Sequence, residues 1–546
     1  MRPITALVLA ATFLASLCVP SSAFGSDAMF GAVGILHQKT SHSRRKLRRS
    51  LAQSVEFGPF YFDQKLDHFH INTTTFRQRY WVNSNHYKAN GPVIFYNAGE
   101  TDATERGGYV LNSTMHDLAQ SLQGIVVVIE HRYYGESTPF SNYTTENLRF
   151  LNTDQALEDM ANFIRTVKVT FPPSYSKSHH TPNPIVSFPR TNNCISRQFP
   201  NLSFTLPPAS HTPWIVYGGS YSGNLAAWMR KKYPDIVFAA VPSSAPVEAR
   251  VDFWQYFEPI RRYGPKKCID AIVSTVDQVD QILFGKDENA KANLYAKFGL
   301  TGLKYDDDFA SLISYPLGNW ENIVPGDNPF IDFCTIFNNS TTPAEYFDTY
   351  AEYLKALIVE ADCPPGGIDA CFTTHNPESS MYTDVTSPYR AWTYQTCTEY
   401  GYWEDAAPKG HTSLLSRKFD INWFQRQCHL TFGEQSITSL ANVEDFNRRY
   451  GGWNVKLTRT IWVDGEWDPW RELSVQSPNA PKRRSTTTAP LVLIPQAVHH
   501  WDFDTGPSVP GTVKQAQVEI LGALQSWLKH YYHAHNIEFR FQILRT

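Results

Sequence analysis

The sequence predicts an α/β fold in which a mostly parallel sheet, covered by helices on both faces, is interrupted by a helical insertion. Short apolar runs bounded by turn residues recur toward both ends of the chain, and runs that are apolar on both faces are typical of buried parallel strands. Helical patterns lie between these runs. The middle of the chain looks different, because it holds amphipathic helical pieces and six of the seven cysteines after Cys18. Because 546 residues exceed one ordinary domain core, either two packed units or one domain with a large insertion is expected, and the middle is interpreted as an insertion.

The predicted strands and helices alternate along the chain. The apolar runs are residues 92–97, 124–130, 214–219, 238–244, 460–465 and 489–495. A helix is predicted over 153–167, with Thr153 or Asp154 as its N-cap, and a last helix over 512–532. These elements assign 50–246 and 451–546 to the two parts of one α/β domain, and 247–450 to a helical cap domain inserted between them.

The N-terminus has the features of an exported protein. Residues 1–23 combine Arg2, an apolar run and small residues in the order of a secretory signal peptide, and the basic cluster at 44–49 fits the end of a propeptide over 24–49. Seven of the 49 Lys and Arg and one of the 52 acidic residues lie in the first 50 positions, which leaves 42 basic and 51 acidic residues and a net charge of −9. That charge argues against a nucleic-acid partner, and no later apolar run is long enough for a membrane anchor. We expect a secreted or extracellular protein, with the lysosome or vacuole as the alternative.

Sequons and cysteines fit the same compartment. None of the seven cysteines after Cys18 forms a CxxC pair, which favours disulfides over a zinc or redox site. One of the seven must stay unpaired, and Cys194 is the natural candidate because it lies in the irregular insertion 172–213. This segment is either a surface loop or translated non-coding sequence. The candidate glycosylation sites, each beginning an N-x-S/T motif, are Asn72, Asn112, Asn142, Asn201, Asn338 and Asn339.

A candidate nucleophile stands where a predicted strand turns into a helix. In "YGGSYSG" (217–223), Ser220 has Gly218 two positions before it and Ser222 two positions after it, which is the G-x-S-x-G pattern with one departure. An α/β-hydrolase places its nucleophile on such a strand–turn–helix bend, because small neighbours relieve the crowding there. Ser222 fits the pattern less well. A glycine-rich turn or a phosphate loop is the alternative, but no Gly-Lys-Ser/Thr follows.

A serine nucleophile needs a base and an acid, which this fold supplies later in the chain in the order Ser, Asp, His. The apolar residues "TIWV" (460–463) of one predicted strand are followed by "DGEWDPW", which offers three candidate acids, Asp464, Glu466 and Asp468. The run at 489–495 is followed by two candidate bases, His499 and His500. Both clusters lie at the carboxyl ends of parallel strands, where such sheets form their sites.

The same reasoning predicts an oxyanion hole. One donor is the backbone N–H of the residue after the nucleophile, Tyr221. The second is expected from the loop after an early strand, where "FYNAGE" (95–100) offers Gly99 or Glu100.

Longer motifs give the chain a family resemblance. They are "FDQKLDHF" (62–69), "IEHRYYGES" (129–137), "GGSYSG" (218–223), "SSAPVEARVDFWQYFEPI" (243–260), "GEWDPW" (465–470) and "AVHH" (497–500). With these motifs the chain resembles the secreted and lysosomal proline-specific serine peptidases, the family of prolyl carboxypeptidase, dipeptidyl peptidase II and the fungal acid prolyl endopeptidases. The motif at 243–260 and "YGYWEDAAPKG" (400–410) are most similar to the fungal branch. Ser222, where the family often has glycine, and Val498, where it often has a smaller residue, depart from the pattern.

The resemblance implies a triad of Ser220, Asp468 and His499 on an α/β-hydrolase fold with a helical cap. It also implies a proline pocket, for which the neighbouring aromatic residues Trp470 and Trp501 are the candidates, with core packing as the alternative. A disulfide between Cys397 and Cys428 is implied, while the pairing of Cys268, Cys334, Cys363 and Cys371 stays open. No metal or cofactor is implied, and members of the family are often active at acidic pH.

The resulting hypothesis is a serine peptidase that hydrolyses peptide bonds on the carboxyl side of proline in peptide or protein substrates. Endopeptidase and exopeptidase action both stay open, as does a homodimer. A carboxylic-ester hydrolase on the same fold and a non-catalytic secreted binding protein are the two alternatives.

Overall fold

The computed structural model describes residues 57–71, 74–167, 206–360, 363 and 367–541. Its centre is an eight-stranded sheet in the order β1-β2-β4-β3-β5-β6-β9-β10. The first two strands pair antiparallel and the other six run parallel to one another. Their bounds are β1 (Phe60–Lys65), β2 (Thr75–Asn83), β3 (Val93–Asn97), β4 (Ile125–Ile129), β5 (Trp214–Gly219), β6 (Ala239–Ser243), β9 (Trp462–Gly465) and β10 (Leu491–Ile494). The predicted α/β class and its six apolar strands are confirmed, whereas β1 and β2 were not predicted.

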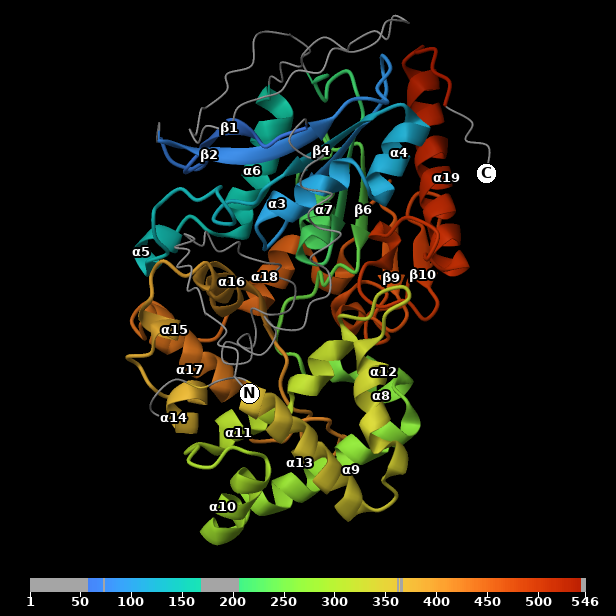
Figure 1. The fold of residues 1–546 in the computed structure, drawn as a ribbon. Helices are drawn as coiled ribbons and strands as arrows, with labels where there is room; N and C mark the ends of the chain where they lie inside the picture. Colours follow the sequence, from blue (N-terminus) through green and yellow to red (C-terminus); the bar gives the residue numbers. More distant parts are fainter. Residues whose placement is uncertain (1–56, 72–73, 168–205, 361–362, 364–366, 542–546) are drawn as a thin grey trace, which may run out of the picture.

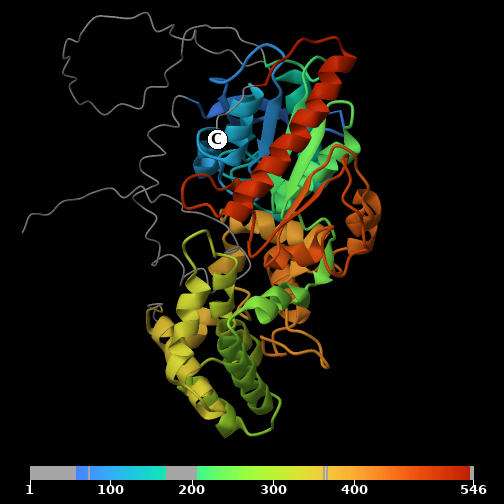
Figure 2. The ribbon, with the colours of Figure 1, turned by 90° about the vertical axis from the view of Figure 1, so that its right-hand side faces the viewer.

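The central strands are apolar on both sides because each face of the sheet carries helices. In β4, Val127 packs into the core on one face, while Val126 and Val128 pack into the core on the other. The first face is covered by α6 (Thr153–Thr166) and α7 (Tyr221–Lys232), and the second by α4 (Thr114–Leu122) and α19 (Gly511–Ala534). Figure 2 shows the long α19 lying across its face of the sheet.

Helix α6 begins as predicted, but its cap is one residue earlier. The side chain of Asn152, whose backbone is extended, accepts a hydrogen bond from the N–H of Gln155 at 3.0 Å. Asn152 is therefore the N-cap, and Thr153 is already helical.

The chain leaves the sheet after β6 and returns to it at β9, the next strand in the sheet. Helices from the intervening residues gather below the carboxyl ends of the parallel strands (Figure 1). They are α8 (Glu258–Tyr263), α9 (Lys266–Leu283), α10 (Glu288–Lys297), α11 (Asp306–Ile313), α12 (Pro329–Cys334), α13 (Pro343–Glu360), α14 (Gly367–Phe372), α15 (Ser380–Thr383), α16 (Tyr389–Gln395), α17 (Ile421–Phe432) and α18 (Val443–Tyr450). We call this part of the chain the cap.

Three disulfides cross-link the cap. They join Cys268 to Cys334, Cys363 to Cys371 and Cys397 to Cys428. Cys194 and most of the irregular segment 172–213 lie outside the described residues, as do the predicted signal peptide and propeptide. Among the described helices, none combines the length and the apolar character that crossing a membrane requires.

The sequon asparagines differ in their surroundings. Asn112, Asn338 and Asn339 are exposed. Asn142 is half-buried, and its Oδ1 accepts a hydrogen bond from the Asn147 side chain at 2.7 Å. Asn72 and Asn201 lie outside the described residues.

Candidate active site

The predicted site residues follow the carboxyl ends of four of the parallel strands, which end at the same edge of the sheet. The loop at 98–100 follows β3, Ser220 follows β5, Asp468 follows β9 and His499 follows β10. Parallel strands that end at one edge bring their following loops together. The cap lies against this same edge (Figure 1).

Ser220 occupies a sharp turn that its glycine neighbours make sterically feasible. Its backbone has φ 57° and ψ −133°, a conformation that L-residues rarely adopt, and helix α7 begins directly after it. A Cβ on Gly218 would lie 2.1 Å from the carbonyl oxygen of Ser222, and one on Gly223 would lie 2.7 Å from that of Ser243. The turn therefore requires glycine at both positions, as in a nucleophile elbow.

The two serines of this turn have different environments. Ser222 is buried, and its Oγ donates to the backbone carbonyl of Asn97 at 2.5 Å. Ser220 is partly exposed, and its hydroxyl makes no hydrogen bond to another described residue. Only Ser220 thus has a hydroxyl free to react.

His499 is oriented by Asp468. Its Nδ1 lies 3.1 Å from both carboxylate oxygens of Asp468, which is fully buried. Asp468 is also fixed by the backbone N–H of Trp470, which donates to its Oδ1 at 2.9 Å. Because the carboxylate accepts from Nδ1–H, the Nε2 of a neutral His499 is left as the base. Ser220 and His499 do not hydrogen-bond in this structure, and such bonds often tighten only when substrate is bound.

The competing acids and the second histidine make other contacts. Asp464 is buried and accepts from Gln476 Nε2 at 2.7 Å, and its burial raises its pKa to about 8. Glu466 accepts from the backbone N–H of Gln496 at 3.1 Å. Among the described residues, no carboxylate forms an ion pair with the His500 ring, and the backbone N–H of His500 donates to Ser244 Oγ at 2.9 Å.

The charges around His499 favour its protonated form. Burial by itself lowers the pKa of His499, but the charge and hydrogen bond of Asp468, followed by the carboxylates of Glu321 and Glu100, raise it to about 9. Burial and the positive charges of His499 and Arg106 hold the pKa of His500 well below its ordinary value. Of the two histidines, His499 is therefore the one that accepts a proton readily.

The two candidate oxyanion donors in the loop after β3, Gly99 and Glu100, differ in whether their backbone N–H groups are already hydrogen-bonded. The N–H of Gly99 already donates to the Asn97 side chain at 2.9 Å. In the described part of the chain, the N–H groups of Glu100 and Tyr221 donate to no protein group. Gly99 is therefore a poor donor for a substrate, and Glu100 remains.

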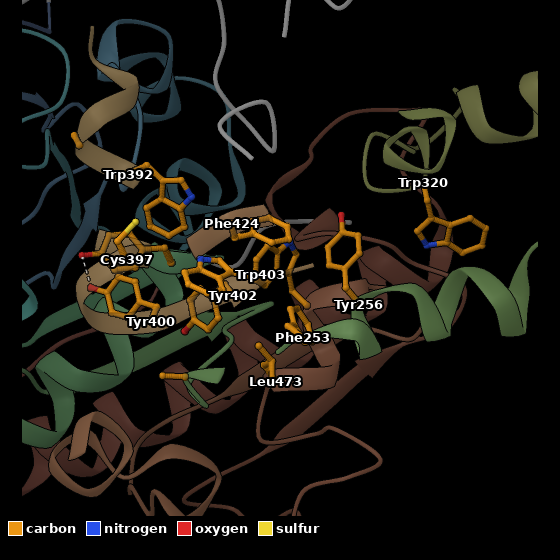
Figure 3. Packing of buried hydrophobic residues seen from close by; sticks show 14 of the residues in the cluster. Phe253, Tyr256, Trp320, Trp392, Cys397, Tyr400, Tyr402, Trp403, Phe424 and Leu473 are labelled. Carbon is orange, nitrogen blue, oxygen red and sulfur yellow. Dashed lines mark hydrogen bonds between the residues drawn. The ribbon is translucent and has the colours of Figure 1, made fainter. Parts of the chain in front are cut away.

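The two predicted pocket tryptophans play different parts in the packing. Trp470 is buried, and its ring lies 6.4 Å from the ring of His499 and 5.6 Å from those of Phe253 and Tyr256. Figure 3 shows Phe253 and Tyr256 within an aromatic cluster that extends to Tyr402. Trp501 instead donates its indole N–H to the carbonyl of Ile323 in the cap at 2.8 Å. Trp470 thus lies near His499, while Trp501 bonds to the cap.

One group of possible metal ligands occurs among the described residues, in the cap. Asp307, Asp308 and His375 have ligand atoms within 4.8 Å of one another. Arg426 Nη1 lies 2.7 Å from Asp307 Oδ2, and His375 Nε2 lies 2.9 Å from Asp307 Oδ1. The carboxylates are thus already paired with cationic or polar side chains, and we assign this group to an ion-pair network.

Comparison with known families fits this geometry. The serine carboxypeptidase S28 family matches residues 64–179 and 199–517. The chain belongs to this family. The family match leaves out residues 180–198 of the S28 peptidase. These residues lie within 172–213, the segment whose composition predicts an irregular insertion.

Curated relatives of the S28 peptidase are serine peptidases. A probable extracellular serine carboxypeptidase of Arthroderma benhamiae is 31% identical over 92% of this chain and 72% of its own. The serine protease vicPa of Bipolaris victoriae is 30% identical over 86% of this chain and 89% of its own. A lysosomal Pro-X carboxypeptidase of Pongo abelii is 26% identical over 95% and 97%, respectively. The chain is therefore a hydrolase of the serine peptidase class, and its relatives include extracellular and lysosomal proteins.

Solved structures resemble the S28 peptidase only distantly. A proline iminopeptidase of Mycobacterium smegmatis matches 86% of this chain and all of its own at 12% identity, with a TM-score of 0.34. The α/β-hydrolase assignment therefore rests on the sheet order and the turn at Ser220.

Sequence reasoning missed Glu321, a cap residue at the site. Its Oε1 lies 3.9 Å from His499 Nε2, and its Oε2 accepts from the Tyr256 hydroxyl at 2.5 Å. Glu321 belongs to no strand-end motif, and nothing local in "GNWENIVP" (318–325) signals a contact with a residue so distant in the chain.

Proposed function

We propose that this protein is a secreted serine peptidase that hydrolyses peptide bonds on the carboxyl side of proline, with Ser220, His499 and Asp468 as its triad. The observation that carries the proposal is the placement of His499 Nδ1 against both oxygens of the buried Asp468, beside an elbow on which only Ser220 has a free hydroxyl. This arrangement supplies the orienting acid, the base and the nucleophile of acyl transfer.

The reaction proceeds through an acyl-enzyme. Ser220 Oγ attacks the carbonyl carbon of the scissile bond, and its proton passes to His499 Nε2. The tetrahedral oxyanion accepts hydrogen bonds from the N–H groups of Tyr221 and Glu100. His499 then gives the proton to the departing amine, the C–N bond breaks, and a water deprotonated by the same histidine releases the acid.

Preference for proline is supported by the chemistry next to His499. The proline ring is rigid and apolar, and Trp470 offers a buried aromatic surface beside His499. The Pro-X carboxypeptidase among the relatives agrees with this preference. The raised pKa of His499 runs against activity at acidic pH, so an acidic optimum does not form part of the proposal.

The test uses peptides with one internal proline, blocked or free at either end, incubated with the mature protein and with Ser220→Ala. Mass spectrometry of the products is expected to show cleavage after proline with the unmutated protein alone. Cleavage of the doubly blocked peptide defines an endopeptidase, and cleavage that needs one free end defines an exopeptidase and the end it recognises. Hydrolysis of short esters without any peptide cleavage would contradict the proposal and favour the esterase alternative.

A further inference from the structure

Glu321 faces the catalytic histidine from the side opposite Asp468. Asp468 contacts Nδ1 of the His499 ring, whereas the Oε1 of Glu321 lies 3.9 Å from Nε2. The Glu321 side chain is only 11% exposed, so water screens its charge weakly. The imidazole is therefore placed between two carboxylates, one from the sheet and one from the cap.

Glu321 is held in place because residues just before and just after it in the chain hydrogen-bond to the loops that follow β9 and β10. Trp320 donates its indole N–H to the carbonyl of Trp467 at 2.9 Å, one residue before the catalytic acid. On the other side, Ile323 accepts the indole N–H of Trp501, two residues after His499. The Tyr256 hydroxyl fixes the carboxylate itself by donating to Oε2. These bonds tie the position of Glu321 to the loops that carry the triad.

The other charges around the pair do not cancel this interaction. The pKa of Glu321 lies above its ordinary value because burial, with the negative charge of Asp468, raises it. The positive charge of His499 and hydrogen bonds from Tyr256 and Trp470 favour the ionised carboxylate and offset part of that rise. The remaining ionisable groups that act on either residue are the carboxyl groups of Asp468, Glu100, Glu404 and Asp502, and the neighbouring His500. His500 favours its neutral form, partly because of the positive charge of Arg106. Among the described residues, Glu321 is the one whose carboxylate forms an ion pair with Nε2 of His499, whereas Asp468 pairs with Nδ1.

We propose that Glu321 is a positioning residue that stabilises the imidazolium form of His499 from the cap side. Acyl transfer passes through this imidazolium once Ser220 gives up its proton, so a carboxylate facing Nε2 lowers the free energy of the charged state. The same carboxylate also stabilises the protonated histidine of the free enzyme, and this sets the pH below which the base is lost. The inference rests on the assignment of His499 as the base in the proposed function.

Removing the charge of Glu321 has a pH-dependent signature. In Glu321→Gln the protonated form of His499 loses a stabilising charge, so the pKa of His499 falls by about one unit. The acid limb of the pH–rate profile, where the rate declines because His499 becomes protonated, therefore moves to lower pH by the same amount. Tyr256→Phe removes the hydrogen bond that favours ionised Glu321, and it shifts the limb in the same direction by less. Glu158→Gln is the matched control: Glu158 also accepts a tyrosine hydroxyl, that of Tyr233, at 2.5 Å, but it lies on helix α6 away from His499.

The experiment measures the rate of inactivation by a fluorophosphonate against pH, because this probe reports the free enzyme without depending on peptide specificity. The expected result is a limb shifted to lower pH in Glu321→Gln and Tyr256→Phe and unmoved in Glu158→Gln. A rate lowered equally at every pH, with the limb unmoved, overturns the inference and leaves Glu321 a structural role while the proposed function stands. Should Glu321→Gln not fold, Tyr256→Phe alone decides between the same two outcomes. An unmutated protein that never reacts overturns both the inference and the proposed function.

Discussion

Ser222 donates its hydroxyl to the carbonyl oxygen of Asn97, so the strand-to-helix turn at β5 is fastened to the end of β3. Because this hydroxyl is buried and already bonded, it cannot serve as the nucleophile. The bond also fixes the loop that supplies the proposed oxyanion donor at Glu100. One serine of the turn thus supports the site, and the other is left to react.

This division predicts opposite results for the two serine variants. Ser220→Ala is expected to abolish peptide cleavage while the protein keeps its thermal stability. Ser222→Ala leaves a buried carbonyl without its donor, so it is expected to cost about 1–3 kcal/mol of stability and to keep most of the activity. Calorimetry and a peptide assay on both variants check this, and full activity in Ser220→Ala would contradict the assignment.

The buried aspartate within β9, Asp464, and the one after it, Asp468, are also expected to give opposite results. Asp468→Asn removes the charge that holds the imidazolium and is expected to lower kcat by about 10⁴-fold. Asp464 has a pKa raised to about 8 and is therefore mostly protonated at neutral pH, so Asp464→Asn changes little there. Steady-state kinetics at pH 7 measure both. A loss in Asp464→Asn as large as that in Asp468→Asn would place the acid at the wrong residue.

The pH dependence follows from the raised pKa of His499. The base acts only when neutral, and the folded pKa of about 9 exceeds the ordinary histidine value of about 6.5. As the pH falls through the folded pKa, the fraction of neutral His499 falls, and kcat/KM is expected to decline with it. A pH profile of kcat/KM tests this. A rate that is still at its plateau at pH 5 would show that the carboxylates do not hold the proton on His499.

The role of Trp470 can be separated from simple packing by comparing substrates. Trp470→Ala is expected to lower kcat/KM for a peptide cleaved after proline by about 10- to 100-fold, because a specific apolar pocket contributes differences of this size. A matched peptide with alanine in place of proline is expected to lose much less. Equal losses for the two peptides would indicate that Trp470 only supports the core.

The disulfide between Cys397 and Cys428 is expected to stabilise the cap. It closes a loop with a sequence separation of 31, for which the chain-entropy argument gives about 4 kcal/mol. The double variant Cys397→Ala/Cys428→Ala is expected to unfold at a correspondingly lower denaturant concentration. An unchanged unfolding midpoint would show that this bond does not form in the mature protein.

Much of the sheet and of the strand-end chemistry could be predicted because it is local in sequence. The apolar run before Ser220 and the glycines around it signal the elbow, and the motifs around Asp468 and His499 follow strands whose ends must meet. The edge strand β1 and its neighbour β2 were missed because neither has a continuous apolar run. Most residues of β1 are exposed or half-buried, and β2 is buried but carries Arg77, Gln78 and Arg79 in its middle. The contacts of Glu321 were out of reach for a different reason, since they depend on how the cap lies on the sheet.

Covalent labelling identifies the nucleophile without relying on any substrate. The mature protein is reacted with a fluorophosphonate and digested, and the modified residue is located by mass spectrometry. We expect one phosphonate adduct, on Ser220, that is lost in His499→Ala. An adduct on Ser222, or no adduct on a folded protein at any pH, would contradict it.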